Sequence, residues 1–293
     1  MVTIFNEFKS SIPEIIEEAR NGHMFVLVDD EDRENEGDII VPAQMATPEV
    51  INFMATWGRG LICLARPPSQ IGRLDLPLMP QRHESRFGTA FTLSIEAATG
   101  VTTGISAPDR ARTIAVAIDP HVQPGDIQTP GHVFPLLARE NGTLERTGHT
   151  EAAVDIARLA GLNPSGVICE IMNEDGDMAR RDDLVAFCQK HNLKIGTIAD
   201  LVAYRLATES LIDQVSDEPF ETEFGEGFRI ITFREHSDSA APEILALVKG
   251  EISPDKPTLT RVHALNMRRD LLGAGGKSSL PDAIRAVNEE GTG

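Results

Sequence analysis

The segment MFVLVDDEDRENEGDIIVPA, residues 24–43, places a dense acidic stretch between two short apolar runs. Seven acidic side chains occupy ten consecutive positions: Asp29, Asp30, Glu31, Asp32, Glu34, Glu36 and Asp38. A charge run is usually a solvated loop. Here the apolar flanks predict two β-strands, which would hold both ends of the loop at the edge of a sheet, where loops often carry binding and catalytic residues.

Strand-like and helical patterns alternate on both sides of this segment. Apolar spacing predicts an amphipathic helix that ends near Gly22. We expect further strands at 24–28, 38–42, 60–65, 90–97 and 166–172, and helices at 48–57, 108–118, 150–160 and 181–191, followed by KIGTIA and DLVAYRLA. Interleaved elements predict an α/β domain over residues 1–206, specifically an α+β type mixed sheet flanked by helices in three layers.

The sequence changes character after about residue 209. Residues 209–227 are acidic and weakly periodic, which predicts a linker or an irregular edge. Strands are expected at 228–233 and 244–248, before the basic segment TRVHALNMRRD, residues 260–270. We therefore expect a second, smaller α/β or β-rich unit over residues 209–293.

The composition limits the possible classes of protein. A formal charge of −18 over 293 residues argues against a nucleic-acid partner, which needs clustered basic residues, but local arginines can still bind a small anion. Three widely spaced cysteines argue against a disulfide framework or a zinc ribbon. The N-terminus lacks a signal-peptide pattern and no apolar run exceeds five residues, so we expect no membrane partner and a cytoplasmic location.

The acidic loop can be compared with a calcium-binding EF-hand, which would make the chain a binding module rather than an enzyme. Residues 32–37 match the start of an EF-hand loop. The bidentate carboxylate of that loop would fall on Ala43, and the flanks resemble strands instead of helices. These departures disfavour calcium binding.

The segment RTGHTEAAVDIARLAGL, residues 146–162, predicts the start of a helix. One interpretation is that Thr147, His149 or Thr150 simply caps it. The other is that free N–H groups at the helix start, together with Arg146 and Thr150, form an anion pocket suited to phosphate. His149 at its rim could then be a metal ligand or an acid/base. The pattern alone leaves both interpretations open.

Two more residues are candidates for proton transfer. His132 lies between two prolines in TPGHVFPL, residues 129–136, which reads as a conformationally fixed loop, although a lone histidine is often structural. Glu170 interrupts the apolar strand of SGVICEIMNEDG, residues 165–176. A carboxylate buried there would need a partner or a shifted pKa. The alternative is that Glu170 lies on the exposed face of its strand.

Five segments occur in the order and spacing of one enzyme family: DDEDRENEGDII, TTGISAPDRA (102–111), PGHVFPL, RTGHTEAAVDIARLAGL and VICEIMNEDGDMAR. Over residues 1–206 the chain resembles 3,4-dihydroxy-2-butanone 4-phosphate synthase of riboflavin biosynthesis. The resemblance implies a homodimer with interfacial active sites. It also implies conversion of D-ribulose 5-phosphate into L-3,4-dihydroxybutan-2-one 4-phosphate and formate, with Mg²⁺ or Mn²⁺.

The same resemblance implies roles for individual residues. The metal ligands would be Glu34 and His149. The catalytic acids and bases would be these four: His132, Glu170, Glu36 and Asp38. The substrate would contact a larger set: Arg33, Glu34, Asp38, Cys63, Thr103, Asp109, Arg146, Thr147, Gly148, His149, Thr150 and Glu170.

The C-terminal segments FGEGFRIITF, ALVKGEI and LTRVHALNMRRDLLGAG resemble the start of GTP cyclohydrolase II. That family holds zinc through cysteines after its RVH stretch, whereas residues 189–293 contain no cysteine and Asn266 stands where the first would be expected. The resemblance therefore implies a degenerate or truncated domain over residues 209–293, with no zinc and no GTP cyclohydrolase II activity.

Overall fold

The computed structural model describes residues 2–80, 88–235, 242–270, 272–273 and 278–293, and the chain divides into two compact units, Met1–Thr208 and Glu209–Gly293. Within these ranges the helices are α1 (Val2–Phe8), α2 (Ile12–Arg20), α3 (Pro48–Phe53), α4 (Pro68–Ile71), α5 (Ala107–Ala117), α6 (His149–Leu159), α7 (Arg181–His191), α8 (Ile198–Thr208), α9 (Met267–Asp270) and α10 (Leu280–Glu290). The strands are β1 (Phe25–Val28), β2 (Gly37–Pro42), β3 (Cys63–Arg66), β4 (Ile95–Ala97), β5 (Ile127–Leu137), β6 (Gly166–Glu170), β7 (Lys194–Thr197), β8 (Ile212–Thr222), β9 (Gly225–Glu235) and β10 (Ile244–Lys249). None of the described helices has the length and apolar character needed to cross a membrane.

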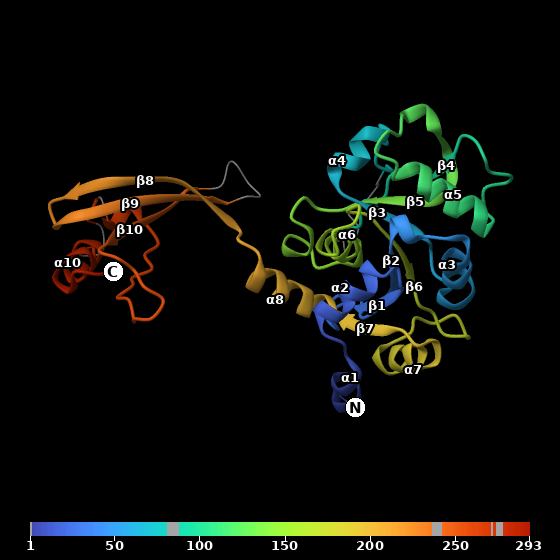
Figure 1. Cartoon of the computed structure of the whole chain (residues 1–293), viewed down its shortest axis with the longest axis horizontal. Helices are drawn as coiled ribbons and strands as arrows, with labels where there is room; N and C mark the ends of the chain where they lie inside the picture. The colour runs from blue at the N-terminus through green and yellow to red at the C-terminus, as the bar shows by residue number, and fades with distance from the viewer. Residues whose placement is uncertain (1, 81–87, 236–241, 271, 274–277) are drawn as a thin grey trace. The chain divides into compact units, whose positions relative to one another are not determined.

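The first unit is built on a seven-stranded sheet in the order β4-β5-β3-β6-β2-β1-β7 (Figure 1). The pairs β3–β5 and β1–β7 are parallel, and the other neighbours are antiparallel. The predicted mixed sheet is therefore confirmed, and the predicted strands 24–28 and 38–42 become the adjacent strands β1 and β2.

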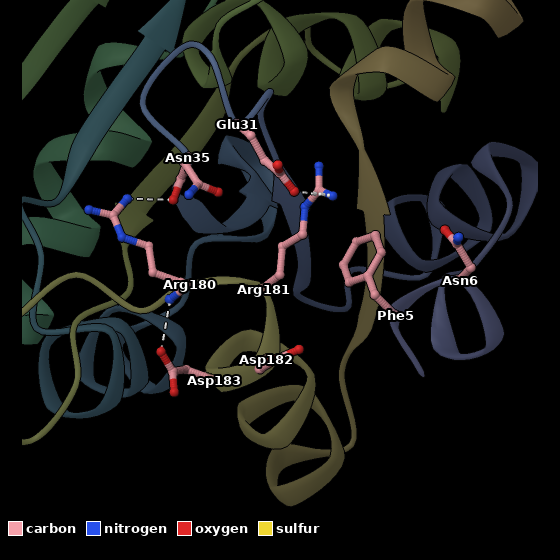
Figure 2. Close-up of a pocket in the computed structure, with 8 residues that line it drawn as sticks. All are labelled: Phe5, Asn6, Glu31, Asn35, Arg180, Arg181, Asp182 and Asp183. Carbon is pink, nitrogen blue, oxygen red and sulfur yellow. Dashed lines mark hydrogen bonds and ion pairs between the residues drawn. The ribbon is translucent and has the colours of Figure 1, made fainter. Parts of the chain in front are cut away.

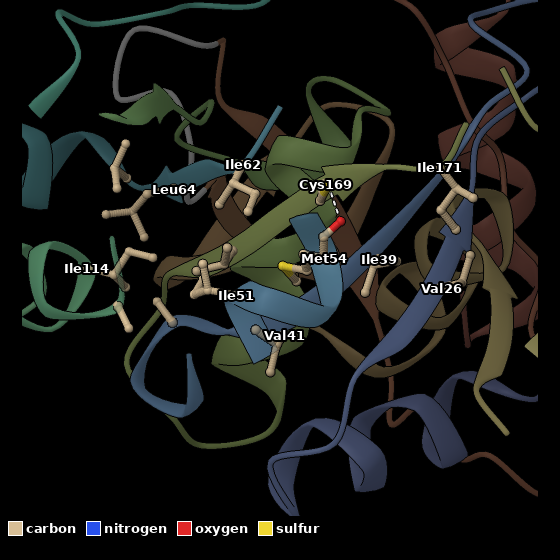
Figure 3. Close-up of a cluster of buried hydrophobic side chains, with 14 of the residues drawn as sticks. Val26, Ile39, Val41, Ile51, Met54, Ile62, Leu64, Ile114, Cys169 and Ile171 are labelled. Atoms are coloured by element: carbon tan, nitrogen blue, oxygen red, sulfur yellow. Dashed lines mark hydrogen bonds between the residues drawn. The ribbon is translucent and has the colours of Figure 1, made fainter. Parts of the chain in front are cut away.

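Successive residues of the central strands bury opposite faces of this sheet. Val26 and Ile39 lie in one apolar cluster with side chains of α3, α5 and α7, part of which is shown in Figure 3. Phe25 and Ile40 lie in a second cluster with side chains of α2, α6 and α8. Because side chains alternate along a strand, both faces of the sheet are covered, and the predicted three-layer arrangement follows.

Strand β5 corrects one sequence-based expectation. The segment 129–136 was expected to be a fixed loop, but it lies inside an 11-residue strand that pairs with β3 and β4. Its prolines hide the strand in the sequence, because proline lacks the N–H that most strand residues donate to a neighbour. The main-chain oxygen of Pro135 still accepts a hydrogen bond from Thr92 N at 3.0 Å.

The opening helix is also different from the expected one, since α1 and α2 are separate helices. Residues 9–11 interrupt them, and Ser11 begins α2 with a capping box to Glu14. This serine and the proline that follows the first residue of α2 are typical signals of a helix start.

The second unit contains a three-stranded antiparallel sheet in the order β10-β9-β8. Of the two expectations for residues 209–227, the linker is wrong, because β8 occupies Ile212–Thr222 and pairs along β9. The irregular edge is confirmed, because β8 is an edge strand of this sheet and its pairing with β9 shifts register at two places. Nearly every residue of β8 is exposed, so the strand has none of the apolar alternation that sequence patterns detect. Its structure follows from hydrogen bonding to β9 rather than from burial.

A candidate active site at one edge of the sheet

Three candidate side chains meet where β3, β6 and β2 reach one edge of the first unit's sheet. Asp38, near the start of β2, stands directly opposite Glu170, the last residue of β6. Cys63 begins β3 and pairs with Ile168 of β6. Strand alternation places Cys63, Asp38 and Glu170 on the face that α6 covers, because Ile168 and Cys63 belong to the apolar cluster beneath that helix.

The acidic loop between β1 and β2 folds around the buried carboxylate of Asp29. This carboxylate accepts hydrogen bonds from Arg33 Nη1 at 2.7 Å, Glu34 N at 3.1 Å and Glu36 N at 2.8 Å. Arg33 Nη1 also donates to Glu34 Oε2 at 2.6 Å. The loop is therefore an ordered turn whose peptide groups are fixed, and its side-chain directions are defined.

His149 begins α6 and is buried against this loop. Its Nε2 lies 3.1 Å from the main-chain oxygen of Leu27, and its Nδ1 lies 3.7 Å from Asp38 Oδ1. A carbonyl oxygen can only accept, so Nε2 carries the proton and Nδ1 keeps its lone pair. Burial lowers the pKa of His149 to about 4, which keeps the ring neutral and suited to metal ligation.

A group of three side chains here could hold a metal ion. One ligand atom from each of Asp29, Glu34 and His149 lies within 4.8 Å of the others, and within the described ranges no other group of His, Cys, Asp and Glu meets this criterion. The carboxylate donors suit Mg²⁺ and Mn²⁺, and the imidazole of His149 adds one nitrogen donor. Asp38 Oδ1 is buried beside them without a hydrogen-bond partner, so a cation or a substrate hydroxyl would satisfy it.

The carboxyl groups at this edge hold their protons more tightly than usual. Burial, reinforced by the charge of Glu170, raises the pKa of Asp38 well above its ordinary value. Burial is also the main cause that raises the pKa of Glu170 and of Glu36. Such carboxyl groups can exchange protons closer to neutral pH than free ones, which is the property of an acid/base catalyst.

Glu170 is half-buried and held in place, which argues against the alternative of a simple exposed strand residue. Its Oε2 accepts a hydrogen bond from Leu61 N at 2.8 Å. The residues that lead to Leu61 form a π-helical turn, Met54–Gly58, followed by Arg59 in the left-handed conformation. Gly60 then passes so close that a Cβ would lie 2.5 Å from Glu170 Oε2. Only glycine permits this approach.

The start of α6 has no side-chain cap among the described residues, because its N-cap is Gly148. The interpretation that Thr147, His149 or Thr150 caps the helix is therefore not supported. The Arg146 guanidinium lies over this helix start, where a Cβ on Gly148 would meet Nη1 at 2.3 Å. Free N–H groups and an arginine together favour an anion such as phosphate. Thr147 is exposed there and Thr150 is buried.

Arg146 is itself anchored. Its Nη1 pairs with the buried carboxylate of Glu151, and its Nη2 donates to Thr89 Oγ1 at 2.9 Å. Burial raises the pKa of Glu151, and the facing arginine opposes that rise. The pair therefore holds the guanidinium in one orientation beside the helix start.

His132, Thr103 and Asp109 form a second group around Glu96. His132 Nδ1 lies 2.7 Å from Glu96 Oε2, and Glu96 packs so closely on Gly104 that a Cβ there would lie 1.7 Å from Oε1. Asp109 accepts from Thr102 N, Thr102 Oγ1 and Gly104 N, at 3.1, 2.7 and 3.0 Å. Asp109 therefore shapes the loop, while Thr103 is exposed on it.

The second group is separate from the first within one chain. Strand β5, which carries His132, is two strands from β6 and three from β2. Neighbouring strands lie about 4.8 Å apart, so the backbone of His132 is roughly 10 Å from the strand of Glu170 and roughly 14 Å from that of Asp38. To exchange protons with the same substrate atom, His132 and these carboxyl groups would each have to lie about 3 Å from that atom.

Sequence reasoning missed two contributors to these groups. Asp29 was noted only as one acid of seven, although its place directly after the apolar run predicts burial better than that of its neighbours. Glu96 was not singled out, yet it interrupts an apolar strand in the same way as Glu170. A carboxylate within a predicted strand is the signal that could have found it.

Comparison with known proteins relates this arrangement to characterised families. Residues 13–204 match the 3,4-dihydroxy-2-butanone 4-phosphate synthase family, and residues 212–293 match the GTP cyclohydrolase II family. The 3,4-dihydroxy-2-butanone 4-phosphate synthase of Pseudomonas aeruginosa is 52% identical over 287 residues, covering 97% of this chain and 78% of that protein.

Two solved structures are similar to the chain. RibBX, a two-domain 3,4-dihydroxy-2-butanone 4-phosphate synthase from A. baumannii, has a TM-score of 0.75 at 46% identity, covering 94% of this chain and 80% of its own. A 3,4-dihydroxy-2-butanone 4-phosphate synthase in complex with two magnesium ions has a TM-score of 0.65 at 41% identity, covering 68% of this chain and 98% of its own.

Substitution of Gly60 tests the close approach to Glu170. The added methyl group of Gly60→Ala would collide with the backbone of Glu170 as well as with its carboxylate, so we expect a loss of about 1–3 kcal/mol of stability. Gly72→Ala is the matched control, because a Cβ at Gly72 meets no atom within 4 Å. Thermal unfolding of both variants measures the difference, and equal melting temperatures would contradict the crowding at Gly60.

The pH dependence of stability tests the burial of Asp38. Its folded pKa is raised above the usual 3.8, so the stability present at pH 3.8 is lost as pH rises toward the folded pKa. Asp38→Asn cannot ionise and should escape this loss. His149 acts in the opposite sense, between pH 6.5 and about 4, in both proteins.

The measurement compares urea unfolding of parent and Asp38→Asn protein in chelator from pH 4 to pH 8. The fluorescence of Trp57, the single tryptophan of the chain, reports on the first unit. The advantage of Asp38→Asn should be near zero at pH 4 and should grow with pH. A difference that stays constant across this range would show that Asp38 ionises normally.

Proposed function

The chain belongs to the 3,4-dihydroxy-2-butanone 4-phosphate synthase family, and on this premise we propose that it is the lyase that converts D-ribulose 5-phosphate into L-3,4-dihydroxybutan-2-one 4-phosphate and formate in riboflavin biosynthesis. One observation carries the proposal. The potential metal ligands Asp29, Glu34 and His149 lie beside buried carboxyl groups, Asp38 and Glu170, whose pKa values are raised.

Glu34 and His149 would hold Mg²⁺ or Mn²⁺, with Asp29 close enough to take part. The ion supplies positive charge that stabilises the negative charge that develops on substrate oxygens. The two carboxylates are hard oxygen donors, which suit these ions, and the group contains no thiolate of the kind that structural zinc sites use. The nearby thiol of Cys63 is protonated, because burial raises its pKa well above the ordinary value, so it would line the substrate pocket without binding metal.

The reaction needs several proton transfers at different carbons. A proton must leave C3 of the sugar to give an enediol, water must be lost, and the carbon skeleton must rearrange. One water must then add back before C4 leaves as formate, because substrate and products together have the same composition. Glu36, Asp38 and Glu170 offer carboxyl groups with raised pKa values within one edge of the sheet. Each can accept a proton in one step and return it in another.

The phosphate of the substrate would lie at the start of α6. Arg146 is oriented there by Glu151, and the N–H groups that follow Gly148 point outward from the helix. Thr147 and Thr150 flank this position. Arg33, which is already held in the acidic loop by its ion pair with Asp29, would contact the substrate from the side of that loop. The sugar would then extend from the helix start toward Asp38 and Glu170.

We further propose that the enzyme is a homodimer and that His132 acts across the interface. The backbone of His132 is roughly 10 Å from the strand that carries Glu170 and roughly 14 Å from the strand that carries Asp38, as the strand order implies. His132 is exposed and Glu96 lies beside it, while Thr103 is exposed on the loop whose Gly104 packs against Glu96. A partner subunit that packs against the sheet edge would complete each site with its own His132 and Thr103, a geometry that symmetric dimers provide.

A different class of function is a protein that binds divalent ions without turnover. The group of Asp29, Glu34 and His149 would serve such a protein equally well. The raised pKa values of Asp38, Glu36 and Glu170 favour the enzyme, because a pure binding site gains from carboxylates that ionise easily.

The deciding experiment incubates the purified protein with ribulose 5-phosphate and Mg²⁺ and measures formate. We expect formate release that stops with chelator and returns with Mg²⁺ or Mn²⁺, because hard oxygen donors bind both ions. Metal binding without formate would instead support the ion-binding alternative.

Mixing inactive variants tests the placement of His132. Glu34→Gln removes a metal ligand, and His132→Ala should lower the rate by about 10²–10⁴-fold. If His132 acts across the interface, a mixture of the two contains dimers with one intact site. Random exchange makes about half of the dimers mixed, so activity should return to about a quarter of the parent.

The matched control mixes Glu34→Gln with Glu170→Gln. These residues belong to the same group within one chain, so a mixed dimer has no intact site and activity should stay low. Restoration by this control pair, or none by the first pair despite proven exchange of subunits, would contradict the proposed arrangement.

The second unit should have no GTP cyclohydrolase II activity, which we test by incubation with GTP and Zn²⁺. His263 Nε2 lies 3.1 Å from Asp270 Oδ2, and Asp270 also accepts from Asn266 N and Ser278 Oγ. These groups satisfy one another, and residues 189–293 offer no thiol for zinc. Formation of formate and pyrophosphate from GTP, or stoichiometric zinc bound to residues 209–293, would refute this prediction.

A further inference from the structure

The first turn of α7 holds the acidic loop from outside. Arg180, the N-cap residue of α7, donates from Nη1 to the main-chain oxygen of Glu34 at 2.8 Å and to that of Asn35. The next residue, Arg181, forms an ion pair of 2.6 Å with Glu31. Figure 2 shows both arginines extending from the helix start toward the loop.

Two peptide groups of the loop converge on one guanidinium nitrogen because Asn35 is left-handed, with φ of 55°. The N–H of Glu34 is bound on the other side by Asp29 Oδ2, at 3.1 Å. Glu34 is therefore fixed through its N–H by Asp29 and through its carbonyl by Arg180. With both ends of the residue held, the direction in which its side chain leaves the backbone is also set.

The helix that carries Arg180 is itself placed firmly against the loop. The backbone N–H of Arg180 donates to Asp183 Oδ2 at 3.0 Å, and Asn173 donates to the same oxygen at 3.2 Å. At the end of the loop, a Cβ on Gly37 would lie 2.6 Å from the side chain of Leu184 in α7. Movement of α7 would therefore move the loop.

Around Glu31 and Asn35 the loop has less support. A cavity of about 390 Å³ lies between these two residues, α1 and the first turn of α7, and both arginines line it (Figure 2). A loop that faces a cavity lacks the close packing that fixes a buried segment. The hydrogen bonds from Arg180 are therefore the main restraint on the carbonyl side of Glu34.

We propose that Arg180 is a positioning residue for the metal site, because it orients Glu34 so that the carboxylate reaches His149 and Asp29. The inference rests on the proposed metal role of Glu34. Partners that orient a metal ligand from behind typically change affinity about 10–100-fold when they are removed. Arg180 acts through the backbone of the ligand and is exposed to solvent, so we expect the lower end of this range.

The test measures Mn²⁺ binding to the metal-free whole chain by electron paramagnetic resonance of the free ion. Arg180→Ala should weaken binding about 10-fold. Arg181→Ala is the matched control, because it removes the same charge from the adjacent residue, whose guanidinium pairs with Glu31 and lies over the Phe5 ring at 5.4 Å instead of holding the backbone of Glu34, so binding should stay within about twofold. Comparison of the two variants cancels the general effect of one lost positive charge near the acids.

Hydrogen exchange of residues 29–37 gives a second readout that needs no metal. Exchange should be faster in Arg180→Ala than in Arg181→Ala, and Arg180→Lys, which keeps a donor and the charge, should recover part of both effects. If the alanine variant does not fold, Arg180→Gln replaces it.

Two outcomes separate this inference from the proposed function. Parent-like Mn²⁺ affinity and parent-like exchange after loss of Arg180 would overturn the positioning role. Parent-like Mn²⁺ affinity in Glu34→Gln would instead remove the metal site itself, whatever Arg180 does.

Discussion

The burial of Asp38 directly opposite Glu170 is the constraint on which the candidate site depends. Two carboxyl groups on facing strand positions cannot both ionise at low cost away from water. The structure leaves Asp38 Oδ1 without a partner and raises the pKa of both groups. Such an edge is stable when protons or a cation reduce the repulsion. The neutral ring of His149 and the carboxylate of Glu34 are placed where a cation would do so.

Close backbone approaches make this concentration of charge possible. Gly60 brings the Leu61 N–H to Glu170, and Gly148 admits the guanidinium of Arg146 above the start of α6. In each case a methyl group would occupy the place of a polar contact. The site is thus built as much by where the chain lacks a side chain as by the acids that it presents, and donors from the backbone restrain the charged groups without adding charge.

The two units use polar groups differently. In the first unit, the oxygen atoms of the buried carboxyl groups do not use all of their hydrogen-bonding capacity. They therefore remain available to bind a substrate or to exchange protons. In the second, Asp270 accepts from His263, Asn266 and Ser278, so hydrogen bonds within the unit consume its acceptors. The match of residues 212–293 to the GTP cyclohydrolase II family therefore coexists with a local network that is structural in character.

The sequence by itself determined the strands around the acidic loop and the mixed three-layer sheet, since apolar runs are local signals. The residues expected near Glu34 followed from the resemblance of five segments to one enzyme family. Sequence patterns did not predict β5, because prolines are unusual inside a strand. They did not predict β8 either, because its side chains are exposed and show no apolar alternation. Only the tertiary structure decided that Asp29 and His149 share one group, that Leu61 restrains Glu170, and that His132 lies several strands away. These relations depend on strand order and on contacts between distant segments, and no local pattern specifies the distance between them.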